Sequence, residues 1–276
     1  MTNYILRGEL GFNTFFIKNE SPGMEIITKD MQLPALSKDD NVIRWGTTRH
    51  VPNGPKMVNK SRCIQETSNK GMFRKKAADA GLAMPTWIDL KSYLRDIEEF
   101  VPVIVRPLHH ERSEHVYMCN TIGEVGQAVD KIGNEFYISH YIAKEKEYRV
   151  FVAQGRPFIV VEKMPVDRNA VTWGCVEAGT FEYIPWDEWP EDVVRVANES
   201  FLLSGLDFAA IDIIYKDGKA YFLEANTAPE ILGYYGASFA KVFKYMFSNG
   251  RDRLSISNYT NWKNCIHPAM SVKANV

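Results

Sequence analysis

Apolar residues recur along the chain at two spacings, one typical of helices and one typical of strands, and the spacing changes several times. Between residues 67 and 85, three apolar positions share a helical spacing: Phe73, Ala77 and Ala80. Gly81 and Pro85 then end the pattern, so this segment predicts one amphipathic helix. A second stripe at helical spacing, from Leu90 to Val101, precedes Pro102.

Two further segments carry the end signals of helices. Thr121 and Glu124 have the spacing of a capping box, and Gly133 fits the position just after a helix. The apolar face of this predicted helix is formed by Ile122, Val125, Val129 and Ile132. A later helix should begin at Pro190, where acidic residues sit at its positive end, and should end at Leu203 before Gly205.

Strand-like runs occupy much of the rest of the chain. Residues 1–60 contain three short apolar runs that read as strands: 4–6, 15–17 and 42–45. Two more runs lie at 102–107 and 115–119, and the three runs 136–142, 147–153 and 157–164 predict an antiparallel sheet. Strands and helices interspersed without strict alternation favour an α+β or mixed α/β enzyme over a barrel or a uniform doubly wound sheet.

Composition limits the class of protein. With 276 residues, 45% of them hydrophobic and 24% charged, the chain is a folded protein long enough for two domains. A net charge of −1 gives no broad basic field, so we expect no nucleic-acid or membrane partner. No C-x-x-C pair and no long apolar span occur, which predicts reduced thiols and a cytoplasmic location.

Oxygen-bearing side chains interrupt two apolar runs that flank residues 216–219, a hairpin signal. They are Asp212 on the first arm, and Glu224 and Asn226 on the second. A buried carboxylate is costly unless a positive partner meets it, and carboxylate and amide oxygens suit Mg²⁺. The hairpin therefore predicts a metal–nucleotide site. The alternative is that the acids lie on the solvated face of a half-exposed hairpin.

The length of the hairpin loop decides whether these side chains can meet, because side chains alternate between the faces of a strand. A two-residue turn at Asp217-Gly218 would pair Asp212 with Leu223 and put Glu224 on the opposite face. A three-residue loop, with Gly218 as a left-handed bulge residue, would bring the two acids and Asn226 to one face. We therefore expect the three-residue loop.

The segment 205–231 resembles the signature of the ATP-grasp superfamily, the carboxylate–amine ligases that include the D-alanine:D-alanine ligases and the ribosomal-protein glutamate ligases. Upstream, residues 68–85 resemble the helix after a Lys-containing segment in these enzymes, and 102–108 the strand that ends in a nucleotide-binding Lys or Arg. Residues 136–152 resemble the adenine hinge followed by a ribose-binding acid. The resemblance implies an ATP-grasp fold, in which two α+β subdomains clasp a nucleotide. It divides the chain into a short N-terminal domain (1–60), two ATP-grasp subdomains (61–142 and 143–250) and an irregular tail (251–276).

The same resemblance implies roles for particular residues. Asp212, Glu224 and Asn226 would hold Mg²⁺, or alternatively Mn²⁺, against the phosphates of ATP. The remaining nucleotide contacts would be Arg74 and Arg106 at the α and β phosphates, the backbone of His140, Tyr141 and Ile142 at adenine, and Glu147 at the ribose hydroxyls. Arg149 and Lys163 would be catalytic cations that face the transferred phosphate or an acyl phosphate. The alternative for these two cations is a cross-strand salt bridge with Glu147 or Glu162.

Three features leave alternatives open. The loop 108–115, glycine-rich in many relatives, contains no glycine here, so it either contacts phosphates through side chains such as Arg112 or closes weakly. Its three histidines are more typical of an exposed loop than of a transition-metal site. Ala210 stands where the D-alanine ligases place an arginine, which argues against their substrate pocket. Trp173, in the connection 167–179 that borders the acceptor site in such enzymes, either stacks on a substrate or packs on the hinge.

The sequence thus predicts an ATP-dependent ligase that joins a carboxylate to an amine through an acyl phosphate and releases ADP. The short N-terminal domain is compatible with an extended substrate such as a peptide or protein terminus. A kinase that phosphorylates a hydroxyl and a non-catalytic nucleotide-binding or scaffold protein are the alternatives. The oligomeric state stays open, although dimers are the commonest soluble assembly.

Overall fold

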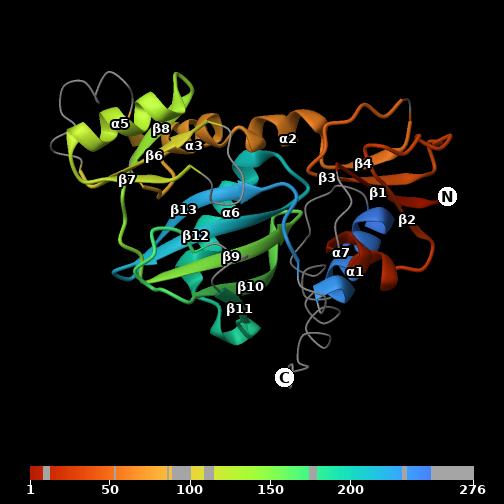
Figure 1. The fold of residues 1–276 in the computed structure, drawn as a ribbon. Coiled ribbons are helices and arrows are strands. Elements are labelled where there is room, and N and C mark those ends of the chain that lie inside the picture. Colours follow the sequence, from red (N-terminus) through yellow and green to blue (C-terminus); the bar gives the residue numbers. More distant parts are fainter. Residues whose placement is uncertain are drawn as a thin grey trace.

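The computed structural model describes residues 1–8, 13–52, 54–85, 87–88, 101–108, 115–173, 179–231 and 235–249. Three sheets organise this part of the chain, and Figure 1 shows the N-terminal sheet at one end of the molecule and the other two stacked beside it. The predicted helix over 90–101 falls almost wholly outside the described residues, and the loop 109–114 and the tail 251–276 lie outside them too.

The N-terminal sheet is parallel, with strand order β2-β1-β3-β4. Its strands are β1 (Asn3–Arg7), β2 (Met24–Ile27), β3 (Asn41–Trp45) and β4 (Lys56–Val58). The predicted strand at 15–17 is wrong, because these residues belong to helix α1 (Asn13–Asn19). Three consecutive apolar residues fit a strand or a helix equally well, and the helix wins because Ile17 is buried in a core shared with α7 (Gly236–Asn249).

The second sheet is small and antiparallel, with order β5-β8-β6-β7. Its strands are β5 (Trp87–Ile88), β6 (Val103–Pro107), β7 (Tyr117–Cys119) and β8 (Phe136–His140). Helices α2 (Ser61–Ser68) and α3 (Lys70–Asp79) precede it in the chain, and α5 (Ile122–Ile132) packs on β6 and β7. The run at 136–142 was expected to share a sheet with the next two runs, but β8 pairs with β5 and β6 instead.

The third sheet has five antiparallel strands in the order β11-β10-β9-β12-β13. They are β9 (Lys146–Ala153), β10 (Arg156–Pro165), β11 (Gly179–Tyr183), β12 (Phe208–Lys216) and β13 (Lys219–Asn226). The short 3-10 helix η2 (Trp186–Glu188) and the helix α6 (Glu191–Ser204) connect β11 to β12. Gly205 ends α6 in the left-handed conformation, as the sequence predicts.

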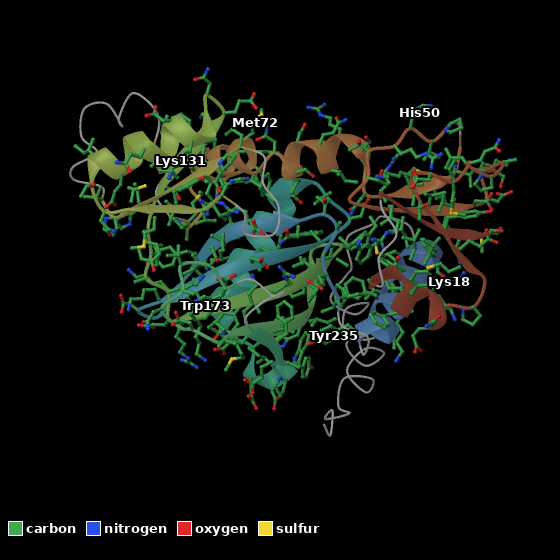
Figure 2. The ribbon with its side chains drawn as sticks, in the orientation of Figure 1. Lys18, His50, Met72, Lys131, Trp173 and Tyr235 are labelled. Carbon is green, nitrogen blue, oxygen red and sulfur yellow. The ribbon has the colours of Figure 1, made fainter. Side chains whose placement is uncertain are left out.

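The two faces of the five-stranded sheet differ. One face is largely apolar and packs on α6, with Val150, Ile211 and Phe222 among its buried residues. On the other face only one end is apolar, where Phe151 and Phe208 pack with residues of α7 and with Trp45 of β3. Tyr235, labelled in Figure 2, lies against Phe151 at this end, with ring centroids 6.1 Å apart. The remaining part of this face is polar.

The helix predicted at 121–133 is confirmed, together with its cap. The Thr121 hydroxyl accepts from the amide of Glu124 at 3.3 Å, and the Glu124 carboxylate accepts from the amide of Asn120 at 2.6 Å. Val125 is fully buried, whereas Ile122, which was predicted on the same apolar face, is 40% exposed, so the prediction is wrong for this residue. No helix among the described residues is long and apolar enough to cross a membrane.

The hairpin of β12 and β13 has a two-residue turn, so the predicted three-residue loop is wrong. Lys216 pairs with Lys219 across Asp217 and Gly218, both of which have positive φ. The register then shifts by one residue, because Leu223 is extra in β13 and Asp212 pairs with Glu224. This bulge brings the two acids to the same face by a route other than the predicted one.

Candidate functional site

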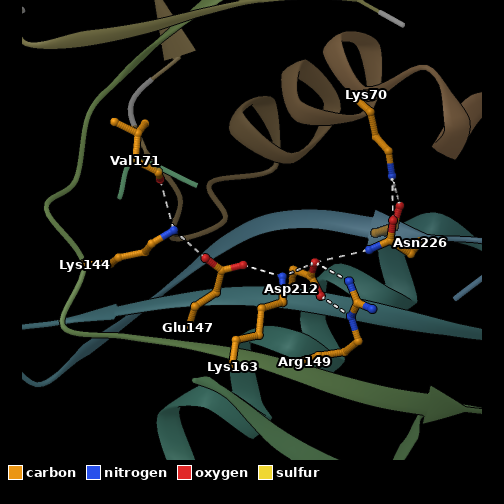
Figure 3. Close-up of polar contacts among 9 residues, drawn as sticks. Lys70, Lys144, Glu147, Arg149, Lys163, Val171, Asp212 and Asn226 are labelled. Atoms are coloured by element: carbon orange, nitrogen blue, oxygen red, sulfur yellow. Dashed lines mark hydrogen bonds and ion pairs between the residues drawn. The ribbon is translucent and has the colours of Figure 1, made fainter. Parts of the chain in front are cut away.

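Three oxygen-bearing side chains from β12 and β13 meet on the polar part of the five-stranded sheet. Asp212 lies directly opposite Glu224 in the hairpin. The side-chain amide of Asn226 donates to Oδ2 of Asp212 at 3.4 Å (Figure 3). Since Asn226 follows Glu224 by two residues in the strand, the three side chains share one face. The prediction that the three side chains lie on one face is confirmed. Their role in metal binding stays a prediction.

Asp212 is buried and is neutralised by cations from β9 and from β10, the next strand beyond it (Figure 3). Arg149, opposite Asp212 on β9, donates from Nε to Oδ1 at 2.8 Å and from Nη2 to Oδ2 at 3.0 Å. Lys163 on β10 donates to Oδ2 at 2.9 Å. Burial alone would raise the pKa of Asp212, but the two cations outweigh it and hold that pKa well below its usual range.

Glu147 is the second buried carboxylate of the site, only 2% exposed. Lys163 donates to its Oε1, and Lys144 donates to its Oε2 at 2.5 Å. Lys163 thus bridges Glu147 and Asp212, and their charges raise its pKa although burial acts in the opposite direction. The salt bridge between Lys163 and Glu147, one of the two predicted alternatives, is present. The catalytic role of Lys163 stays a prediction.

Glu224 differs from these two acids, because no residue in the described part of the chain donates a hydrogen bond to its carboxylate. Burial would raise its pKa, yet nearby Lys70, together with Arg106 and Lys163, lowers it to about 2. Glu224 is therefore an ionised acceptor with its oxygens available. The described residues contain no cluster of three or more His, Cys, Asp and Glu placed to hold a metal. A set of two carboxylates and one amide still fits Mg²⁺, which keeps water and phosphate in its other positions.

Lys70 belongs to the site, although the sequence analysis did not select it. It is the first residue of α3, and its ammonium donates to the backbone carbonyl of Ala225 and to Oδ1 of Asn226, the latter at 3.4 Å (Figure 3). Burial lowers its pKa, and Glu224 and Asp212 oppose this change. The available signal was its place near the start of the segment 68–85, which resembles the helix that follows a Lys-containing segment in the family.

Arg74 lies one turn further along α3 and supports the fold around the site. Its Nε donates to the carbonyl of Leu223 at 3.0 Å, and its Nη1 donates to Ser139 of β8 at 3.2 Å. The guanidinium also lies over the ring of Tyr137, 5.4 Å from its centroid. Arg74 therefore joins the small sheet to the bulge that aligns Asp212 with Glu224. Its predicted phosphate contact stays a prediction.

Arg106 and the residues predicted to contact adenine, 140–142, belong to the small sheet and to the link that follows it. Arg106 is on β6, and its Nε is buried without a hydrogen-bond partner among the described residues. His140 ends β8 opposite Val103, and the amide of Tyr141 donates to the carbonyl of Pro102 at 2.9 Å. Tyr141 and Ile142 lie in the link between β8 and β9, which leads from one sheet to the next. Their predicted contacts with adenine remain predictions.

The arrangement of these elements defines the class of fold. A small antiparallel sheet with α3 and a larger antiparallel sheet face a shared polar site, and the parallel N-terminal sheet lies beside them. This is the ATP-grasp fold, as the sequence predicts, and comparison with solved structures shows it over nearly the whole chain.

Three solved structures illustrate the similarity. D-alanine–D-alanine ligase from Bacillus anthracis in complex with ATP matches with a TM-score of 0.63 at 16% identity, over 99% of this chain and 97% of that one. The ATP-grasp ligase PsnB, with a minimal precursor, Mg and ADP, has a TM-score of 0.62 at 12% identity, over 97% of both chains. The RiPP-associated ATP-grasp ligase of Chryseobacterium gregarium, with ADP and a leader and core peptide, has a TM-score of 0.63 at 14% identity, over 92% of this chain and 100% of that one.

Among curated proteins, the D-alanine–D-alanine ligase of Fusobacterium nucleatum subsp. nucleatum is 28% identical over 174 residues. The match takes in 59% of this chain and 57% of that ligase, so the chain spans little more than half the length of this relative. No protein-family model matches the sequence.

Proposed function

We propose that this protein is an ATP-dependent carboxylate–amine ligase that forms ADP through an acyl phosphate. The observation that carries the proposal is the state of Glu224. It is an ionised carboxylate without a hydrogen-bond donor among the described residues, on the same face as Asp212 and Asn226. An ionised carboxylate without a hydrogen-bond donor destabilises the fold, but together with Asp212 and Asn226 it provides ligands for a divalent cation that binds a triphosphate.

The charges of the site favour a bound anion. Among the described residues, cations outnumber the three carboxylates Glu147, Asp212 and Glu224. These cations include Lys70, Arg106, Lys144, Arg149 and Lys163. Mg·ATP carries a net negative charge, so its phosphates would offset the excess of positive charge. Bound Mg²⁺ would supply further neutralisation of the phosphates, with Asp212, Glu224 and Asn226 as its ligands and Mn²⁺ as a substitute for the same oxygens.

The residues divide between nucleotide and reaction. Lys70 and Arg106, which approach Glu224 from α3 and β6, would bind the α and β phosphates, while Arg74 holds the strand beneath them. Glu147 accepts one bond on each oxygen, which leaves further lone pairs for two ribose hydroxyls. The backbone of His140, Tyr141 and Ile142, in the link between the sheets, would meet adenine.

Arg149 and Lys163 would stabilise the charge that develops on the transferred phosphoryl group. In the first step a substrate carboxylate oxygen attacks the γ-phosphorus, the bond to the β-phosphate oxygen breaks, and ADP leaves. In the second step an amine attacks the acyl carbon, inorganic phosphate leaves with the electrons of the broken C–O bond, and the amine loses a proton.

The substrate pocket would differ from that of the D-alanine ligases at position 210, where those enzymes place an arginine. Ala210 is fully buried in the apolar core and offers no cation to a substrate. The fold matches peptide-bound ATP-grasp ligases over nearly their full length. We therefore propose a peptide or protein terminus as one substrate. Because the reaction needs ATP, the cytoplasm is the compartment that we propose for it.

The test is substrate-dependent ADP release with hydroxylamine present, across peptides with free carboxyl termini and a set of amines. Trapped hydroxamate and a condensation product that both require wild-type Glu224 would support the proposal. A stable phosphorylated product without free phosphate would indicate a kinase instead. Wild-type protein that does not bind Mg·ATP would reject the nucleotide site altogether.

A further inference from the structure

Lys144 has three partners around a buried ammonium, and neither the sequence nor the proposed reaction assigns it a role. Its Nζ donates to Oε2 of Glu147 at 2.5 Å and to the carbonyl of Val171 at 3.2 Å (Figure 3). The same atom lies 4.8 Å from the ring centroid of Trp173. The side chain is only 7% exposed. A lysine buried in this way is costly unless its charge is compensated, and here two hydrogen bonds and an aromatic ring surround the ammonium.

The partners of Lys144 belong to two separate parts of the site. Glu147 is on β9, and in the proposed function its carboxylate binds the ribose hydroxyls. Val171 and Trp173 belong to the segment 167–173, which follows β10, and Trp173 is only 5% exposed beside the five-stranded sheet (Figure 2). Lys144 itself lies in the link that leads from the small sheet to β9. One side chain thus connects three segments.

The segment 167–173 is otherwise bonded to itself. The amide of Asn169 donates to the Asp167 carboxylate at 2.8 Å, the amide of Ala170 to the Asp167 carbonyl at 3.2 Å, and the indole of Trp173 to the Ala170 carbonyl at 3.1 Å. Within the described residues, the bond from Lys144 is the one hydrogen bond that ties this segment to the rest of the protein. Removal of Lys144 should therefore free the segment and also release Oε2 of Glu147.

We propose that Lys144 is a positioning residue that fastens the segment 167–173 to Glu147, so that nucleotide affinity depends on how firmly this segment is held. The inference rests on the proposed function for its nucleotide part. Lys144 orients Glu147 from one side while Lys163 orients it from the other, which fixes the carboxylate that receives the ribose. Trp173 covers the ammonium and keeps water from it.

The first experiment measures amide hydrogen exchange of peptides covering 167–173 in the nucleotide-free full-length protein. Lys144→Met should raise exchange there by about tenfold or more, because a local opening that loses one charge-assisted bond becomes that much more frequent. Lys146→Met is the matched control, since Lys146 is two residues away but half-exposed, and its ammonium pairs with Glu162 and not with Glu147. The control should exchange like wild type. Equal exchange in Lys144→Met and Lys146→Met would overturn the proposal.

The second experiment measures Mg·ATP affinity by calorimetry in a double-mutant cycle of Lys144→Met and Trp173→Leu. Each single variant should bind at least about fivefold more weakly, and the double variant no more weakly than the worse single, because the two side chains act as one unit. Additive losses would contradict the link between them. In turnover, KM for ATP should rise more than kcat falls, a split that a general loss of stability does not produce.

Failure of the proposed function has a different signature. If wild-type protein binds no Mg·ATP, the ligase assignment falls, and the exchange data alone decide whether Lys144 fastens the segment. Should Lys144→Met not fold, Trp173→Leu carries the exchange test, since it removes the ring but leaves Glu147 paired with both lysines. Wild-type exchange in that variant would then overturn the proposal.

Discussion

Asp212 and Glu224 face each other across the hairpin of β12 and β13 because Leu223 is an extra residue in β13. The two-residue turn at Asp217-Gly218 would by itself pair Asp212 with Leu223 and send Glu224 to the face that packs on α6. The bulge restores the match within five residues of the turn. The candidate metal site therefore depends on a local irregularity that must itself be held in place.

Arg74 holds this irregularity, so its replacement should destabilise the protein even without nucleotide. Arg74→Met removes the donor to the part-buried Leu223 carbonyl and the buried bond to Ser139. We expect a loss of about 3 kcal/mol in the free energy of unfolding, typical of breaking a buried charged hydrogen-bond network. Urea unfolding of the nucleotide-free protein measures it.

The matched control for Arg74 is its neighbour Lys75, whose partner Asp79 is equally exposed. Lys75→Met should change the free energy of unfolding by less than about 0.5 kcal/mol, as surface pairs generally do. If Arg74→Met were as stable as this control, the guanidinium would not be supporting the bulge, and a direct phosphate contact would be its better explanation.

Glu224 and Asp212 should respond differently when each is made neutral. Glu224→Gln removes a carboxylate that has no donor among the described residues, so the fold should persist while Mg²⁺-dependent ADP release falls by roughly 100-fold or more. Asp212→Asn also leaves Arg149 and Lys163 without their common partner. We expect it to lose activity and about 3 kcal/mol of stability as well.

Thermal unfolding and ADP release, measured on the same preparations, separate these two outcomes. An active Glu224→Gln variant would contradict the assignment of this acid to the metal. An Asp212→Asn variant as stable as wild type would mean that the ion pairs with Arg149 and Lys163 contribute little to the fold.

The sequence predicted those parts of the structure whose signals are local. The capping box at Thr121 and the glycines after α5 and α6 report their own surroundings, so these helices were foreseen with their ends. The run at 15–17 carries no period, and its helical state depends on tertiary contacts, above all with α7, more than two hundred residues away. The bulge at Leu223 is likewise set by partners distant in the chain, including Arg74.

The same distinction holds within the site. Asp212, Glu224 and Asn226 could be selected because oxygen-bearing groups beside apolar residues are unusual in any strand. Lys144 could not, because in the sequence it belongs to a charged run that reads as a solvated connection. Its burial depends on Trp173 and Val171, which reach it only through the fold.

Lys70 should prove more important for nucleotide binding than the sequence suggested. Lys70→Met removes an ammonium that touches Asn226 and lies near Glu224, where the phosphates would be held. We expect Mg·ATP to bind about 10- to 100-fold more weakly, the range for losing charge-assisted contacts of about 1.5–3 kcal/mol. Calorimetric titration measures it, and Lys76→Met on the outer side of α3 is the control, since Lys76 pairs with exposed Glu66. Equal affinity in both variants would remove Lys70 from the nucleotide site.

Asp40 should make the stability of the N-terminal sheet depend on pH. Its carboxylate accepts from the amides of Thr2 and Ser37 at 2.7 and 2.8 Å and from the Ser37 hydroxyl at 2.8 Å, and these bonds lower its pKa below the ordinary 3.8. A lowered carboxyl pKa means that the unfolded chain takes up the proton first as pH falls. The contribution of Asp40 is therefore complete above pH 3.8 and is lost as the pH falls from there through the lower value of the folded state.

Asp40→Asn should unfold at lower urea concentrations than wild type at pH 7, and the difference should shrink steadily below pH 4. If the difference in urea midpoint between the variant and wild type stayed constant down to pH 2.5, the hydrogen bonds from the amides of Thr2 and Ser37 would not depend on the charge of this side chain.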